Sequence, residues 1–150
     1  MRRPGANILA GPGAPAGAVG ALLALQLAAA GLLGSATRES VFFAGRALDW
    51  GCAFRDRFGF ACPNCGMTRS VLLSLHGRVG EALSVNPAGP VLVLGVALFS
   101  AAMFYLMLYE RRHAGTAAAA RVRRAITRGA LAYAALLMAV WLGHWLSVIS

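Results

Sequence analysis

The residues best suited to chemistry in this chain are two cysteines separated by two positions, Cys62 and Cys65. Thiols at this spacing can close a local disulfide, exchange disulfides with a partner or bind a soft metal ion. Arg69 follows the pair closely, and a nearby guanidinium lowers a thiol pKa because it stabilises the thiolate. The pair alone therefore leaves three interpretations open: a structural disulfide, a redox centre and a metal site.

Two further residues bear on these interpretations. Cys52 precedes the pair and stands alone, so it can be a resolving thiol, a disulfide partner for another chain or an inert buried residue. His76 follows the pair and can act as a proton shuttle or a ligand, although a histidine at a membrane interface explains it equally well. The four zinc ligands that the sequence offers are Cys52, Cys62, Cys65 and His76, yet structural zinc sites more often show two clear cysteine pairs.

The rest of the chain is too apolar for a soluble domain. Of its 150 residues, 59% are hydrophobic and only 13% are charged, and the mean hydropathy is +0.66. A soluble domain of this size could not cover its own surface with so few polar residues. We therefore expect an integral membrane protein.

Three apolar segments are long enough to cross a bilayer, residues 16–34, 91–109 and 129–148. Each is close to the roughly 20 residues that a helix needs to span about 30 Å of hydrocarbon. Asn86 and Pro87 precede the second segment, where an asparagine side chain can cap the first amides and proline suits the first helical turn. The sequence predicts an all-α membrane protein with three transmembrane helices in a single domain.

The positive charge of the chain predicts its orientation. All fourteen basic residues are arginines, and with five acidic residues they give a net charge of +9. Arg2 and Arg3 precede the first span and six arginines lie in residues 110–128, so both segments are predicted to be cytoplasmic. The loop 35–86 is then extracytoplasmic, although it also holds six arginines. Because the arginines lie between apolar runs, topology and lipid phosphate explain them better than nucleic acid.

The first span also has the features of a secretory signal peptide. Two arginines precede its apolar run, and the small residues Gly34, Ser35 and Ala36 follow it. The run is longer than the usual signal core of about 7 to 15 residues, which favours an uncleaved anchor. Cleavage would leave the rest of the predicted topology unchanged.

Residues 58–86 are predicted to form a helical hairpin that is interfacial or re-entrant. Their apolar positions are interrupted too often to cross the bilayer alone, by Arg69, His76, Arg78 and Glu81. Gly77 and Gly80 are expected to break the segment into a helix, a turn and a second short helix. Non-helical backbone at membrane depth must be covered by protein, so the hairpin should pack against the spans.

Two other connecting segments carry weaker signals. Residues 40–50 are rich in aromatic side chains, which is typical of a segment at the lipid headgroup level. Residues 114–128 begin with alanines and end with arginines, a pattern that fits a short helix on the anionic inner leaflet with Thr116 as its cap. A solvated positive loop explains the same residues.

The cysteine tract resembles a known family. The run Cys62-Pro63-Asn64-Cys65-Gly66-Met67-Thr68-Arg69 is similar to the Cys-Pro-x-Cys-Gly-x-Thr-Arg pattern of the bacterial membrane proteins grouped as the domain of unknown function 2752 family. Asn64 and Met67 stand where that family usually has glycine and leucine. The resemblance runs from residue 58 to the end of the second span and implies a bacterial cytoplasmic (inner) membrane, but no function. The residues that share the family pattern are Cys62, Pro63, Cys65, Gly66, Thr68, Arg69, His76, Asn86 and Pro87.

The polar residues of this pattern suggest local roles. Thr68 can cap the helix that it begins. Arg69 can bind lipid phosphate, hold a partner carboxylate or stabilise a thiolate, with Asp56 and Glu81 as its candidate partners within the chain. A structural knot of cap, salt bridge and disulfide that holds the loop on the bundle explains the same residues.

The favoured function is a noncatalytic accessory or interaction subunit of a larger membrane assembly. The sequence has no paired carboxylates at useful spacing, nucleophile elbow, metalloprotease helix or phosphate-binding glycine loop, so we expect no cofactor. Its partners are predicted to be the lipid bilayer and a membrane protein, with no nucleic acid, and a homo-oligomer is compatible with the sequence. Small residues that allow close helix contact occur along the second span, at Gly95, Ala97, Ala101 and Ala102.

Two alternatives to this function remain open. The first is a membrane thiol–disulfide oxidoreductase, in which Cys62 and Cys65 react and Arg69 favours the thiolate. The second is a zinc-stabilised interaction module that uses the four ligands named above.

Overall fold

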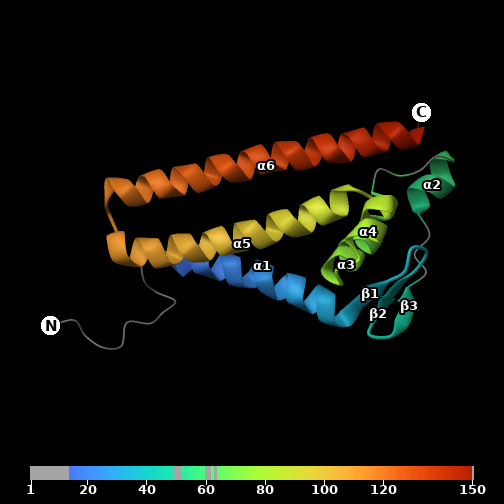
Figure 1. Ribbon diagram of the computed structural model, residues 1–150, viewed down its shortest axis with the longest axis horizontal. Helices are drawn as coiled ribbons and strands as arrows, with labels where there is room; N and C mark the ends of the chain where they lie inside the picture. The colour runs from blue at the N-terminus through green and yellow to red at the C-terminus, as the bar shows by residue number, and fades with distance from the viewer. Residues whose placement is uncertain (1–13, 49–51, 60–61, 63, 150) are drawn as a thin grey trace. The chain divides into compact units, whose positions relative to one another are not determined.

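The computed structural model describes residues 14–48, 52–59, 62 and 64–149. Arg2, Arg3 and Pro63 lie outside the described residues. By contacts, the chain divides into two compact units, Met1–Leu25 with Val96–Ala132 and Gln26–Gly95 with Tyr133–Ser150. The elements labelled in Figure 1 are α1 (Ala14–Leu33), β1 (Gly34–Ala36), β2 (Val41–Phe43), β3 (Arg46–Leu48), α2 (Ala53–Phe58), α3 (Met67–Leu75), α4 (Val79–Val85), α5 (Ala88–His113) and α6 (Ala117–Ile149).

Three of these helices, α1, α5 and α6, are long and apolar enough to cross a membrane. This confirms the predicted class, an all-α membrane protein with three spans. The predicted start of the second span is also confirmed, because the backbone N–H of Ala88 donates to Asn86 Oδ1 at 3.0 Å. Asn86 thus caps the start of α5, and Pro87 lies between this cap and Ala88, the first residue of the helix.

The helix α6 differs from the expectation in its length. Residues 117–128, expected as a separate short helix or a solvated loop, are continuous with the third span. The alanines at the start have high helix propensity, and no proline interrupts the basic stretch that follows. Thr116 acts as the predicted cap, since its Oγ1 accepts a hydrogen bond from Ala119 N at 3.2 Å.

In the first unit, α1 and α5 approach closely at small residues. The Ser100 hydroxyl donates to the carbonyl of Gly20 at 2.7 Å. Gly17 lies against Met107, with which a Cβ atom would collide, and Gly20 lies against Ser100 O and Met103, which a Cβ atom would crowd. Small residues at such a crossing let two helix backbones approach, as they do in membrane helix pairs.

In the second unit, the predicted helical hairpin is present as α3 and α4. Gly77 forms the turn between them with φ 74°, a conformation in which glycine avoids the clash of a Cβ atom. Gly80, also expected to break the chain, lies inside α4. One glycine costs a helix only about 1 kcal/mol, and the burial of Ala82 on the same helix offsets this cost.

A small antiparallel sheet that the sequence analysis did not predict precedes the hairpin. Its strand order is β1-β2-β3, with Ser35 opposite Phe42 and Phe42 opposite Ala47. Figure 1 shows β1 beside α3, and the core that they share contains Ala36, Leu72, Leu73 and Ala82. Strands of three residues are too short to show a two-residue hydrophobic alternation, which is why the pattern indicated only an aromatic-rich segment.

Candidate three-cysteine site

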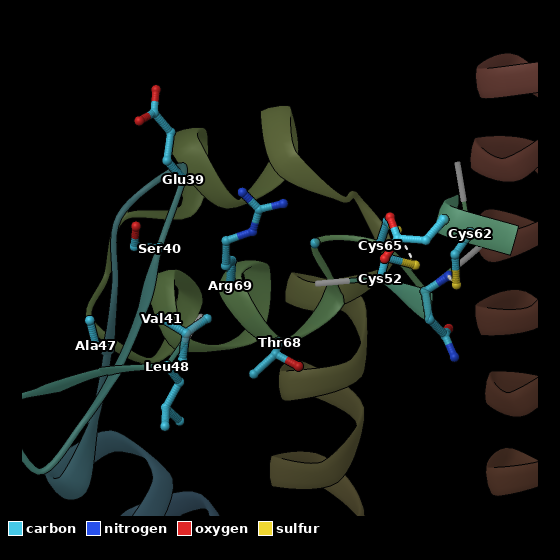
Figure 2. Close-up of a pocket in the computed structure, with 13 residues that line it drawn as sticks. Glu39, Ser40, Val41, Ala47, Leu48, Cys52, Cys62, Cys65, Thr68 and Arg69 are labelled. Carbon is cyan, nitrogen blue, oxygen red and sulfur yellow. Dashed lines mark hydrogen bonds between the residues drawn. The ribbon is translucent and has the colours of Figure 1, made fainter. Parts of the chain in front are cut away.

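The three cysteines of the chain meet at one place in the second unit. The Sγ atoms of Cys52, Cys62 and Cys65 all lie within 4.8 Å of one another, and the Cys65 thiol donates to Cys52 Sγ at 3.3 Å (Figure 2). All three side chains are half-buried thiols. Around a tetrahedral zinc ion with Zn–S bonds of about 2.3 Å, sulfur atoms lie about 3.8 Å apart. The observed spacing therefore fits three ligands of one ion.

A tight turn before α3 holds Cys65 in place. Cys65 N donates to Cys62 O at 2.9 Å and Met67 N to Asn64 O at 3.0 Å. Gly66 follows with φ 79°, and a Cβ atom there would lie 2.7 Å from Val85 Cγ1. Glycine is needed at this position both for its backbone conformation and for the close approach of α4.

Two fully buried polar residues, Ser70 and Asn86, lie beneath the surface at this turn, and both have 0% exposure. Asn86 Nδ2 donates to Cys65 O at 3.3 Å while the same side chain caps α5. The Ser70 hydroxyl lies 2.9 Å from Ala82 O and 2.6 Å from Asn86 O. These contacts tie α3, α4 and the start of α5 together. The sequence analysis missed Ser70, although its position three residues before Leu73 places it on the apolar face of α3.

Asn64, between the two cysteines of the pair, connects the loop to α6. Its backbone N–H donates to Cys62 Sγ at 3.3 Å, and its Oδ1 accepts a hydrogen bond from Trp141 Nε1 at 2.9 Å. The family usually has glycine here, which could not make the second contact. Trp141 stacks on Trp145, with ring centroids 6.3 Å apart.

The three thiols open on a pocket of about 780 Å³. The pocket extends from the cysteines past Thr68 to the strands β2 and β3, where Val41 and Leu48 line it. Figure 2 shows Arg69 between the strand residues that line the pocket and the cysteines. The site therefore combines a cluster of sulfur ligands with a cation in the same pocket.

Burial, and to a lesser extent the hydrogen bond to Cys52, raise the pKa of the Cys65 thiol to about 11. At neutral pH Cys65 is thus a thiol unless a cation binds to the sulfur. Arg69 was expected to stabilise a thiolate, but it is not among the groups that shift the Cys65 pKa. Cys65 is consequently a poor attacking nucleophile in this arrangement.

Arg69 and Thr68 have other neighbours than predicted. The Arg69 side chain donates to the backbone carbonyl of Arg38. The expected Arg69–Glu81 pair is wrong, because Arg78 contacts both oxygens of Glu81 at 2.7 Å and Arg38 lies 3.3 Å from one of them. The expected cap is also wrong, since Gly66 is the N-cap of α3 and Thr68 lies inside the helix.

His76 lies apart from the thiols. Its Nδ1 is 2.8 Å from the carbonyl oxygen of Leu72, and the side chain is exposed at the end of α3. In the described part of the chain, the group of converging metal ligands contains the three cysteines without His76. The structure thus brings together three of the four ligands that the sequence offered.

The fold and the site define an all-α membrane protein with a cysteine cluster beside a short helical hairpin. Residues 52–100 match the family model described as "Protein of unknown function (DUF2752)". This match confirms the resemblance that the cysteine motif predicted. It begins at Cys52 and so includes all three clustered cysteines. No curated protein and no solved structure matches the chain significantly.

Proposed function

We propose that this protein is a noncatalytic membrane module in which Cys52, Cys62 and Cys65 bind a soft divalent ion, with zinc as the best fit. The convergence of three thiols within 4.8 Å supports this proposal. Thiolate ligands favour zinc over harder cations, and a structural zinc site contributes directly to folding. The ion would join the start of α2 to the turn before α3 and so hold the shape of this face for a partner.

A simple disulfide between Cys62 and Cys65 accounts for less of the geometry. Such a bond uses two sulfur atoms and gives no reason for a third to approach. Cys52 Sγ nevertheless lies 3.3 Å from Cys65 Sγ, although nine residues separate Cys52 from the pair. The buried contacts of Ser70 and Asn86 fix the backbone around Cys65 without any bond between sulfurs. The scaffold thus preorganises a three-thiol site.

The proposed location is a bacterial cytoplasmic membrane, with the N-terminus in the cytoplasm and the cysteine cluster outside. The arginine distribution and the family resemblance support it. A membrane-protein partner would contact the cluster face or the spans. Gly95 was expected to contact a partner helix, but Tyr133 of the same chain covers it. Ala97 and Ala101 on α5 are exposed and remain available for a contact with a partner helix.

A membrane thiol–disulfide oxidoreductase is the second candidate function, favoured by the approach of the Cys62 and Cys65 Sγ atoms to within 4.8 Å of one another. In that reaction Cys62 would attack a partner disulfide and form a mixed disulfide, and Cys65 would then displace the partner. The products are a Cys62–Cys65 disulfide and a partner dithiol, so two electrons pass to the partner. The raised pKa of Cys65 slows the second step.

Metal content and thiol labelling separate the two functions. The protein is purified in detergent micelles with zinc, and bound zinc and maleimide labelling are measured with and without a chelator and a reductant. The proposal expects one zinc per chain and labelling of the cysteines only after chelation. Labelling that requires reduction, without bound zinc, would support the oxidoreductase.

Single variants identify the ligands. Replacement of Cys52, Cys62 or Cys65 by serine is expected to lower zinc affinity at least tenfold, since each removes one thiolate ligand. His76→Ala is the matched control and should keep full zinc content, because His76 contacts Leu72 O instead. Equal loss in the His76 variant would restore the four-ligand set and contradict the three-thiol site.

A further inference from the structure

We propose that the metal ion at this site keeps a fourth coordination position open to the pocket, where it binds a small ligand that carries both a thiol and a carboxylate. This inference rests on the proposed metal site. A metal site with three protein ligands and one open position accepts water or an added ligand, whereas closed structural sites have four protein ligands. The question is therefore which group would fill the fourth position.

The described side chains near the cysteines leave that position to an external ligand. His76 is held at Leu72 O, and the Asn64 side-chain oxygen is bonded to Trp141. In the described residues, the group of converging metal ligands contains Cys52, Cys62 and Cys65 and no fourth member. All three cysteines line the same pocket, so the open position faces it.

The pocket has the size and charge pattern for such a ligand. Its volume of about 780 Å³ lies in the range of small-molecule sites. Arg69 also lines it, and none of the ion pairs among the described residues includes Arg69. Figure 2 shows the Glu39 carboxylate directed away from this guanidinium. An arginine with unused donors at a pocket wall is suited to bind a carboxylate.

Two carboxylates that line the pocket oppose this binding, those of Glu39 and Asp56. Asp56 lies on the short helix α2 that follows Cys52. Its carboxylate repels an anionic ligand, while Arg69 attracts it. Asp56 and Arg69 should therefore change the affinity in opposite directions, which provides a control within the same site.

Binding involves no change of oxidation state. The thiol of the ligand loses its proton to solvent and its sulfur replaces a water molecule on the metal. The carboxylate end lies toward Arg69. A thiolate suits the fourth position because it matches the softness of the three cysteine ligands.

The test uses protein loaded with Co²⁺, whose visible spectrum responds to a change of ligand. Two probes with the same two-methylene spacer are added without oxygen, 3-mercaptopropionate with a carboxylate and cysteamine with an ammonium group. We expect 3-mercaptopropionate to change the spectrum at about tenfold lower concentration, as one charge-assisted contact of about 1.4 kcal/mol would give. Arg69→Gln should abolish this preference, Arg69→Lys should keep part of it, and Asp56→Asn should increase it. The Co²⁺ spectrum without probe verifies that each variant folds.

The possible failures are distinguishable. Protein that takes up no Co²⁺ would contradict the proposed function itself. Protein that binds Co²⁺ tetrahedrally but responds to neither probe would have a closed site, which overturns this inference and leaves the proposed function in place. Equal response to both probes, unchanged in Arg69→Gln, would overturn the role of Arg69. Loss of Co²⁺ to the probes, measured after gel filtration, would also overturn the inference.

Discussion

The contact between α1 and α5 in the first unit and the hairpin of α3 and α4 in the second unit are held together by different means. In the first, glycines meet methionine side chains, and one hydrogen bond from Ser100 to Gly20 joins the helices. In the second, buried Ser70 and Asn86 make several hydrogen bonds within a small apolar core. Large apolar side chains remain exposed along the long helices, including Leu22, Leu25 and Leu131. The spans thus depend on close backbone approach and a lipid-covered surface, whereas the hairpin needs a core of its own.

The largest effect is expected from Asn86→Ala. This change removes the cap of α5 and leaves the Cys65 carbonyl without its amide donor. Because the Asn86 side chain is fully buried and makes both contacts, we expect a loss of about 3 kcal/mol in the free energy of unfolding, measured in mixed micelles. Ser84→Ala, at an exposed position of α4, should change it by less than about 0.5 kcal/mol. Equal effects of the two changes would show that the hairpin has no polar core.

Gly66→Ala is expected to have the next largest effect. Alanine would be strained at the positive φ of this position, and its Cβ atom would collide with Val85. We therefore expect a loss of about 2 kcal/mol in the free energy of unfolding. Gly77→Ala is the matched control, because Gly77 also has a positive φ but nothing within 4 Å of its Cβ position. It should cost only about 1 kcal/mol. The difference between the two unfolding free energies measures the close approach of α4 to the cysteine turn.

Trp141→Phe tests the connection between α6 and the cysteine loop. It keeps an aromatic ring but removes the donor to Asn64 Oδ1. We expect a loss of about 1 kcal/mol in stability, together with faster maleimide labelling of Cys62. Asn64→Gly, which restores the residue usual in the family, should give the same acceleration. Labelling at the wild-type rate in both variants would mean that this bond does not restrain the loop.

Ser100→Ala should show how little one hydrogen bond contributes between spans. It removes the donor to Gly20 O, and we expect a loss of about 0.6 kcal/mol, the typical value between membrane helices. A loss as large as that of Asn86→Ala would remove the proposed contrast between the two regions. The same micelle unfolding measurement applies to both.

The smallest effect concerns Glu81 and pH. The hydrogen bond from Arg78, with the attraction of Arg38, lowers the pKa of Glu81. A carboxyl group with a lowered folded pKa contributes stability above its unfolded pKa of about 4.3, and this is lost as pH falls through the folded value. Glu81→Gln should therefore be slightly less stable than wild type at pH 7 and equally stable at low pH. Thermal unfolding at both pH values measures the difference.

Several features could be predicted from the sequence because they depend on neighbours along the chain. The three spans follow from summed hydropathy over about 20 residues. The Asn86 cap and the Thr116 cap act on amides two or three residues away. The family resemblance rests on the short cysteine motif, and the match to residues 52–100 confirms it.

Other features were decided only when distant segments packed together. Cys52 joins Cys62 and Cys65 because the loop folds back, and nothing in its local sequence indicates that approach. Ser70 is buried, and Arg38 reaches Glu81, for the same reason. The Arg78–Glu81 pair is by contrast local, since the two residues are three positions apart. Hydropathy is summed over adjacent residues and a cap acts within a few residues, so both can be read from the local sequence. The contacts of Cys52, Ser70 and Arg38 depend instead on how distant segments such as α3, α4 and β1 pack together.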